Sequence, residues 1–191
     1  MLFRSEASMA DALEGRAPIV WPDRLRVAAL PPQARLVFRG DAEAAARAGD
    51  AFGATLPMTP CRAAAHDARA ALWLGPDEWL LLAPPGTEDG TARDIAAALA
   101  DLPHALVCVS DRHAALTVSG PRAETLLAAG CALDLDPRAF PQGICTRSLL
   151  AKAEIVLWRH QPASFRLEVR RSFAAYVWDF LAEAAREHAS A

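Results

Sequence analysis

The sequence predicts an α+β fold in which antiparallel sheets are covered by helices. The expected strands far outnumber the expected helices and do not alternate with them one for one, which argues against a doubly wound parallel sheet. Two stretches roughly eighty residues apart also repeat one order of elements: Leu36–Gly40 and Leu116–Gly120 each resemble a strand that ends in glycine and leads into a helix. We therefore expect two related β-α-β-β-β-α halves, residues 34–110 and 111–188.

Residues 1–33 are expected to form an extended N-terminal arm, and residues 34–191 a single domain. The arm has little periodicity and contains four prolines, so it should hold at most a short helix near residues 9–15. Trp21 lies in this segment, and so large a ring must pack either on this domain or on a partner.

The first half begins with a half-buried strand at residues 36–39, where apolar positions alternate and Gly40 ends the run. Asp41 should cap a helix that extends to about residue 51. A second helix should open at Thr91, because Asp94 three residues later completes a capping box. The other expected strands are 61–65, 69–74, 78–82 and 104–110.

The second half repeats the plan, with a strand at residues 114–118 and a helix that has Pro121 in its first turn and ends near Gly130. Phe165, Leu167 and Val169 alternate with charged residues, the clearest period-two pattern in the chain. The expected strands that follow the helix are 146–150, 153–158 and 165–170.

The last helix should be capped by Ser172 and should carry two apolar strips. The spacing predicts a buried stripe centred near Phe173, Phe180 and Ala184. Trp178 lies roughly 130° from that centre, so it should face away from the core. A second strip of smaller residues flanks it. We expect a partner interface here, either exposed or covered by the arm, made of Trp21, Ala174, Trp178 and Ala185.

Composition excludes several classes of function. A net charge of -3 argues against nucleic-acid binding, which needs clustered cations. The four cysteines stand far apart without a CxxC motif, which favours buried free thiols in a reducing compartment over a metal or redox site. The first residues turn acidic, and no run approaches the roughly 20 apolar residues of a membrane span. We expect a soluble cytoplasmic protein that binds no membrane.

No residue pattern predicts a catalytic, cofactor-binding or metal site. The chain lacks a GxGxxG motif and a phosphate-binding loop. Ser110, Asp111 and His113 have the residue types of a nucleophile triad, but such close neighbours on a strand generally cannot form the required hydrogen-bonded chain. Asp134, with Pro137 soon after it, is typical of a turn or cap residue.

From residue 105 to about 185 the chain resembles the gamma subunit of heterotetrameric sarcosine oxidase, and Leu74–Leu81 resembles it more weakly. The motifs that carry the resemblance are Ser110-Asp111-Arg112, Val118-Ser119-Gly120-Pro121, Leu126-Leu127-Ala128, Gly130-Cys131, Leu133-Asp134-Leu135, Ala151-Lys152-Ala153 and Arg171-Ser172-Phe173-Ala174.

This resemblance implies a fold similar to the folate-binding aminomethyltransferase domain of the glycine-cleavage T-protein. It also implies a complex that oxidises sarcosine to glycine, with hydrogen peroxide and either formaldehyde or methylene-tetrahydrofolate as the other products. FAD, FMN, NAD and tetrahydrofolate are expected on the partner subunits and none on this chain. The implied partners are the alpha, beta and delta subunits, chiefly alpha, and the gamma chain itself is expected to be non-catalytic.

Two alternatives remain. One is a free-standing folate-binding aminomethyltransferase-like protein, although this chain has Ala132-Leu133-Asp134 where a T-protein has Thr-Asn-Asp, and it lacks the Lys-Gly-Cys-x-x-Gly-Gln-Glu box of folate-dependent iron-sulfur maintenance relatives. The other is the matching subunit of an oxidase for a related N-methyl amine, because substrate contacts would lie on other chains.

Overall fold

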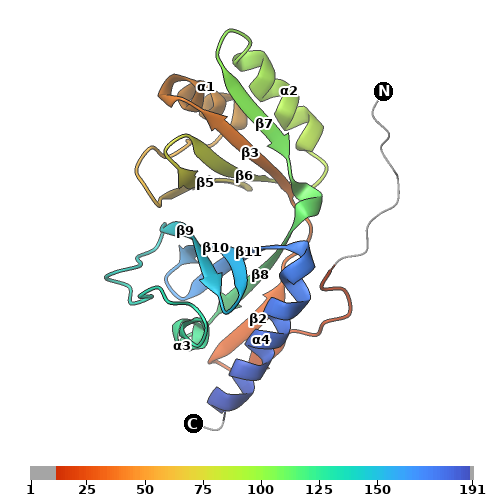
Figure 1. Cartoon of the computed structure of the whole chain (residues 1–191), viewed down its shortest axis with the longest axis vertical. Coiled ribbons are helices and arrows are strands. Elements are labelled where there is room, and N and C mark those ends of the chain that lie inside the picture. Colours follow the sequence, from red (N-terminus) through yellow and green to blue (C-terminus); the bar gives the residue numbers. More distant parts are fainter. Residues whose placement is uncertain (1–11, 190–191) are drawn as a thin grey trace.

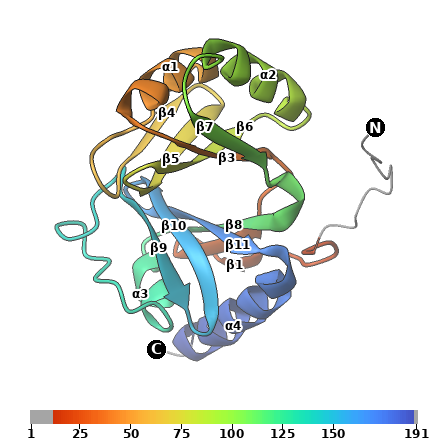
Figure 2. The same cartoon turned by 45° about the horizontal axis from the view of Figure 1, so that its top comes forward.

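The computed structural model describes residues 12–189 and arranges them in four layers, helix, sheet, sheet and helix (Figures 1 and 2). Two antiparallel sheets stack face to face, and two helices cover the outer face of each. The predicted α+β class is confirmed, as is the β-α-β-β-β-α order of elements in each half.

The first half forms a five-stranded sheet with the order β4-β5-β6-β3-β7, and every neighbouring pair in it is antiparallel. Its outer face is covered by α1 (Ala42–Phe52) and α2 (Glu88–Ala98). The strands are β3 (Ala34–Gly40), β4 (Ala63–His66), β5 (Arg69–Gly75), β6 (Glu78–Ala83) and β7 (His104–Cys108).

The second half, together with two strands from the N-terminal segment, forms a six-stranded sheet with the order β1-β2-β8-β11-β10-β9. A short 3-10 turn, η1 (Ser110–Arg112), connects the two halves, and α3 (Ala123–Ala128) and α4 (Arg171–Ala189) cover the outer face. The strands are β1 (Ile19–Trp21), β2 (Leu25–Ala29), β8 (His113–Ser119), β9 (Cys145–Leu150), β10 (Ala153–Gln161) and β11 (Ser164–Arg170).

Part of the segment expected to be an arm belongs to this second sheet. β1 and β2 form a hairpin, and β2 pairs with β8. The prolines do not prevent this pairing, because Pro18, Pro22, Pro31 and Pro32 all lie outside the two strands, where no ladder N–H is needed. Residues 12–15 form a turn, and the rest of the short helix expected near residues 9–15 lies outside the described residues.

The internal repeat extends to the arrangement of strands. Written from the opposite end, the second sheet begins β9-β10-β11-β8-β2, which matches β4-β5-β6-β3-β7 strand for strand. Strand β7 thus holds in the first sheet the place that β2 holds in the second. Among the residues described, β1 is the strand without a counterpart.

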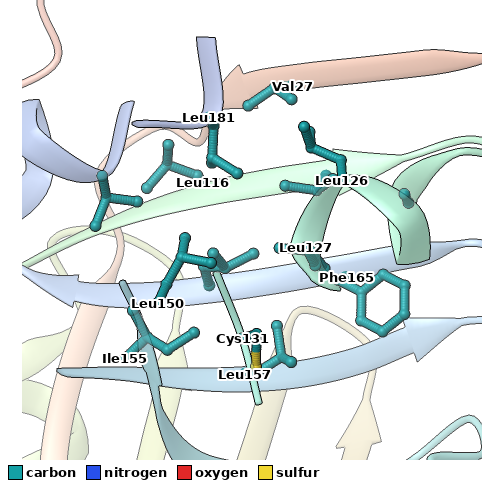
Figure 3. Close-up of a cluster of buried hydrophobic side chains, with 14 of the residues drawn as sticks. Val27, Leu116, Leu126, Leu127, Cys131, Leu150, Ile155, Leu157, Phe165 and Leu181 are labelled. Carbon is teal, nitrogen blue, oxygen red and sulfur yellow. The ribbon is translucent and has the colours of Figure 1, made fainter. Parts of the chain in front are cut away.

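Three hydrophobic clusters fill the spaces between the four layers. One lies between α1, α2 and the first sheet, and another between the two sheets. The third lies between α3, α4 and the second sheet, where Figure 3 shows Val27 of β2, Leu116 of β8 and Leu181 of α4 in one cluster.

The predicted start of α1 is confirmed, and the predicted start of α2 is wrong. Asp41 caps α1 as expected, since its carboxylate accepts a hydrogen bond of 2.9 Å from the N–H of Ala44. The expected start at Thr91 is wrong, because α2 begins at Glu88 and buries Thr91 inside the helix. Acidic Glu88 and Asp89 favour the earlier start, since they lie at the positive end of the helix dipole.

The helix expected at Pro121 begins two residues later, at Ala123. Gly120 precedes it with φ of 109°, and a Cβ there would clash with the backbone carbonyl of Arg24. The repeat's second glycine is therefore required by the close approach of the chain before β2.

Candidate functional site

The predicted interface on α4 lies in the core of the protein. Ala174, Val177, Trp178, Leu181 and Ala185 form the buried face of the helix, and Trp178 is 5% exposed. The expectation that Trp178 faces away from the core is therefore wrong, and the expected buried stripe is displaced around the helix. The small side chains of Ala174 and Ala185 allow α4 to approach the sheet closely, which the apolar spacing alone did not indicate. Ser172 lies inside the helix rather than capping it, because α4 begins at Arg171.

The N-terminal segment packs on the same side of α4. Leu13, Leu25 and Val27 share the core cluster of Trp178, and partly buried Trp21 packs against that cluster. Arg16 forms an ion pair with Asp179, the residue after Trp178. The alternative in which this segment covers the strip agrees with the structure. Ala174, Trp178 and Ala185 are buried in the core cluster of the second sheet, so a partner cannot reach them in this fold.

Aromatic side chains instead lie on the outer face of α4. Phe173 is 42% exposed and Tyr176 is 38% exposed, and their rings meet edge to face with centroids 6.5 Å apart. The sequence predicts Phe173 at the centre of the buried stripe, and its exposure shows that this prediction is wrong.

A buried cluster of charges connects the two sheets. Glu168 of β11 is fully buried and accepts hydrogen bonds of 2.7 Å from the Nε atoms of both Arg35 on β3 and Arg166 on its own strand. Arg35 comes from the first sheet, so the cluster joins one half of the protein to the other. Because all three side chains are buried, their mutual pairing is what offsets the cost of removing them from water.

A cleft of about 240 Å³ opens beside this cluster, between the sheets. Its apolar wall includes Val37, Leu80, Val107 and Val156. Most of its charged residues are already paired: Arg147 with Glu78, Arg170 with Glu154 at 3.7 Å, and Glu168 with the two arginines described above. The cleft therefore combines an apolar interior with a rim of ion pairs.

Ser110 and His113 lie next to this cleft without forming a catalytic pair. The Ser110 hydroxyl accepts a hydrogen bond of 2.9 Å from the backbone N–H of Arg35, which fixes η1 to the first sheet. Burial lowers the pKa of His113, and nearby Arg112 lowers it further against the opposing effect of Glu168. The Nδ1 atom of His113 is buried without a hydrogen-bond partner in the described structure. Both groups therefore belong to the junction between the sheets.

Asp134, the remaining polar candidate, and the buried Arg159 both have structural roles. Asp134 accepts a hydrogen bond of 3.0 Å from the backbone N–H of Asp136, which agrees with its prediction as a turn residue. Arg159 is buried and pairs with Glu124 at 2.8 Å, while its guanidinium lies over the ring of Phe165. Neither side chain is presented to the cleft as a free group.

All four cysteines are free thiols, as expected, but not all are buried. Cys131 and Cys145 are buried, whereas Cys108 is exposed. Burial raises the pKa of the Cys145 thiol to about 12, so the thiol is neutral and unreactive at ordinary pH. Residues 12–189 contain no group of acidic, histidine and cysteine side chains able to hold a metal ion. No helix within that range is long and apolar enough to cross a bilayer.

Comparison with families of known proteins gives one consistent match. A model described as the sarcosine oxidase, gamma subunit family matches residues 39–187. Proteins named sarcosine oxidase subunit gamma from Corynebacterium sp. (strain P-1) and Arthrobacter sp. are each 37% identical to the chain, over 142 and 141 residues. These alignments cover 74% and 73% of this chain, and 69% and 68% of the two relatives.

Comparison with solved structures agrees. A chain of the heterotetrameric sarcosine oxidase from Corynebacterium sp. U-96, solved in complex with pyrrole 2-carboxylate, matches with a TM-score of 0.82 and 27% identity, over 89% of this chain and 88% of that one. The glycine cleavage system aminomethyltransferase T from Bartonella henselae matches with a TM-score of 0.60 and 12% identity, over 81% of this chain and 44% of that one. The second likeness concerns the fold alone, and it agrees with the fold that the sequence resemblance implied.

Proposed function

The chain belongs to the sarcosine oxidase gamma subunit family, and from this premise we propose that it is the gamma subunit of a heterotetrameric sarcosine oxidase. The observation that carries the proposal is the superposition on a chain of such an oxidase over nearly the whole length of both proteins, with a TM-score of 0.82. The family match over residues 39–187 supports it independently of the structure.

We infer that this subunit stabilises the complex and performs no chemistry itself. The charged groups around its cleft are largely used in ion pairs that hold strands and sheets together, so few remain to bind or activate a substrate. FAD, FMN, NAD and tetrahydrofolate would be bound by the other subunits. The alpha subunit would be the main contact, with beta and delta completing the complex.

The proposed complex removes the N-methyl group of sarcosine by oxidation. Two electrons and two protons leave the N-methyl group of sarcosine and reduce oxygen to hydrogen peroxide, which leaves an N-methylene imine of glycine. Water hydrolyses this imine to glycine and formaldehyde. When tetrahydrofolate is present, it takes up the methylene carbon in place of water, and glycine and methylene-tetrahydrofolate are released. In this scheme the gamma chain affects turnover through assembly alone.

Co-expression with candidate alpha, beta and delta chains tests the proposal. A tag on this chain should recover all four subunits together, and the purified complex should produce peroxide when sarcosine is added. Omission of this chain should reduce the yield of intact complex. Failure of the tagged chain to recover any flavoprotein subunit would contradict the proposed function.

Two further measurements separate the alternatives. Titration of the isolated chain with tetrahydrofolate should give no saturable micromolar binding, and such binding would instead favour a folate-binding aminomethyltransferase-like protein. Peroxide production by the complex should be faster with sarcosine than with other N-methyl amines. A strong preference for another amine would assign the chain to a related oxidase.

A further inference from the structure

Strand β7 leaves one edge of the first sheet open. It pairs with β3 on one side, and no other described strand pairs with it (Figures 1 and 2). His104, Ala105, Val107 and Cys108 are exposed, and Val107 is 55% exposed. The strand has no Lys, Pro or acidic residue, the features by which proteins usually prevent an edge from pairing with another chain.

The other sheet edges are less suited to pairing. β1 has three residues, and β4 has four, three of them alanine. β9 carries Arg147, which pairs with Glu78 of the other sheet. The first residue of β9, Cys145, also donates a backbone hydrogen bond of 2.9 Å to the carbonyl of Cys61. Of the four edge strands, β7 is therefore the one best suited to pair with a strand of another chain.

The internal repeat indicates what should occupy that edge. Strand β2 holds the equivalent place in the second sheet, and β1 covers its outer side in antiparallel pairing. The registers agree: Leu106 lies opposite Phe38 in β3, and Val27 lies opposite Val118 in β8, the repeat partner of Phe38. In the second sheet, Ile19 of β1 lies opposite Val27 on the outer side of β2. The equivalent place in the first sheet is opposite Leu106 on the outer side of β7, and no described strand fills it.

The backbone amides of β7 point in the same alternating directions as those of β2, where the N–H of Leu30 donates a 2.8 Å bond to the carbonyl of Ala115 in the adjacent β8. The N–H of Val109 donates a 2.8 Å bond to the carbonyl of Arg35, the residue that precedes Leu36 in β3. Since amides alternate along a strand, those of Ala105 and Val107 also point toward β3, and those of His104, Leu106 and Cys108 point outward. A chain placed beside β7 would therefore meet a row of backbone donors and acceptors that pair with no other strand among residues 12–189.

The cleft between the sheets continues this edge with side chains. Leu80, Val37 and Val107 lie opposite one another across three neighbouring strands, and all three line the cleft. Leu80 is 2% exposed, so this apolar row runs from the core to the open edge. A residue beside Val107 on an added strand would extend the row over the mouth of the cleft. The volume of about 240 Å³ is below the roughly 300 to 1,000 Å³ of typical small-molecule sites and suits one or two inserted side chains.

We propose that an extended segment of another subunit of the oxidase adds to β7 as the sixth strand of the first sheet, antiparallel to it. An apolar side chain of that segment enters the cleft beside Val107. The added strand takes the place that β1 has in the second sheet, so the complex completes the repeat. This inference rests on the proposed role as a gamma subunit, which supplies the partner chains.

Hydrogen exchange of the wild-type chain, alone and in the purified four-chain complex, tests the backbone pairing. The amides of Leu106 and Cys108 should exchange quickly in the isolated chain and at least tenfold more slowly in the complex. The amides of Ala105 and Val107, already bonded to β3, should be slow in both states. Protection of Leu106 and Cys108 in the isolated chain, or no change on assembly, would overturn the proposal.

Paired variants test the side chains. Val107→Lys places a charge on the edge, whereas Val20→Lys changes a valine of similar exposure, 50%, on the edge of the other sheet. Val107→Lys should reduce recovery of the complex at least tenfold, and Val20→Lys should leave it unchanged. Equal recovery with both variants, or equal loss with both, would contradict the assignment to β7.

The proposed function and the edge proposal fail in different ways. If wild-type chain recovers no partner subunit, the proposed function fails. If the wild type and Val107→Lys recover the complex equally, the function stands and the edge proposal falls. A dimer of the isolated chain that Val107→Lys dissolves would show that β7 pairs with a second copy, which also overturns the proposal. Thermal unfolding of the isolated Val107→Lys variant close to that of wild type confirms that the comparison concerns assembly.

Discussion

At the scale of single residues, the charges of β11 are the feature that sequence alone could not place. The alternation of Phe165, Leu167 and Val169 with charged residues correctly predicted the strand. A period-two pattern indicates one polar face, but it does not say what lies against that face. Here a second sheet does, so Arg166 and Glu168 are buried and Glu168 reaches Arg35 in the other half of the chain.

Replacement of Glu168 by Gln should destabilise the isolated chain strongly. Loss of the carboxylate charge leaves two buried guanidinium groups facing each other, and breaking a buried ion pair typically costs about 3 to 5 kcal/mol. Urea denaturation would measure the free energy of unfolding. Glu154→Gln is the matched control, since its pair with Arg170 is half-exposed and such pairs contribute about 1 kcal/mol or less. Equal effects of the two variants would contradict a structural role for the buried cluster.

His113 should make stability depend on pH. Burial lowers its pKa in the folded protein, so the unfolded chain binds more protons at acidic pH, and stability must rise with pH in that range. The free energy of unfolding should fall as the pH drops below about 6.5, the ordinary histidine value. His113→Gln should reduce this slope, while exposed His66→Gln should not. His160 also has a pKa lowered by burial and should account for part of the remaining slope. An unchanged slope in His113→Gln would refute the assignment.

At the scale of elements, the positions of the strands followed from the sequence better than the orientation of the last helix. Alternation and glycine punctuation placed β3, β5, β6, β8, β10 and β11 within a few residues. For α4, the spacing allows two apolar strips, and the strip with the larger rings is the one that the sequence predicts to be buried. The structure buries the strip with Ala174 and Ala185, because small residues let the helix lie close to the sheet, and it leaves Phe173 and Tyr176 outside.

Truncation of Trp178 should therefore act on folding rather than on assembly alone. Trp178→Ala removes a large buried side chain from the core, which typically costs about 3 to 5 kcal/mol. Phe173→Ala on the exposed face of the same helix should change the free energy of unfolding by about 0.5 kcal/mol or less. Chemical denaturation of both isolated variants would measure this. Similar stability of the two variants would mean that the orientation of α4 described here is wrong.

The N-terminal strands were missed for a related reason. Four prolines in the first 33 residues indicate an extended arm. In the structure these prolines lie outside the strands, and β1 and β2 are part of the second sheet. The sequence signal that could have found them is the alternation Leu25, Val27 and Ala29, which is too short to be decisive without its neighbour β8. Strand pairing at long range determines such segments more than their own composition does.

At the scale of the whole molecule, the duplicated unit accounts for the matching strand orders of the two sheets and for the open edge at β7. Each half supplies two helices and most of the strands of one sheet, and β2 and β7 hold equivalent places in the two sheets. The inner faces of the sheets meet over an apolar cluster and the Arg35–Glu168 pair. The sequence shows the repeat, but it does not show that β2 belongs to the second sheet. This strand precedes the first half in the chain and nevertheless pairs with β8 of the second half.

The most direct test of the account is recovery of a four-chain complex through this subunit. Tagged wild-type chain, co-expressed with candidate alpha, beta and delta chains, should bring all three with it, and the complex should produce hydrogen peroxide from sarcosine. The isolated chain should produce none. Sarcosine oxidation by this chain without partners, or recovery of the tagged chain without any flavoprotein subunit, would contradict the central claim.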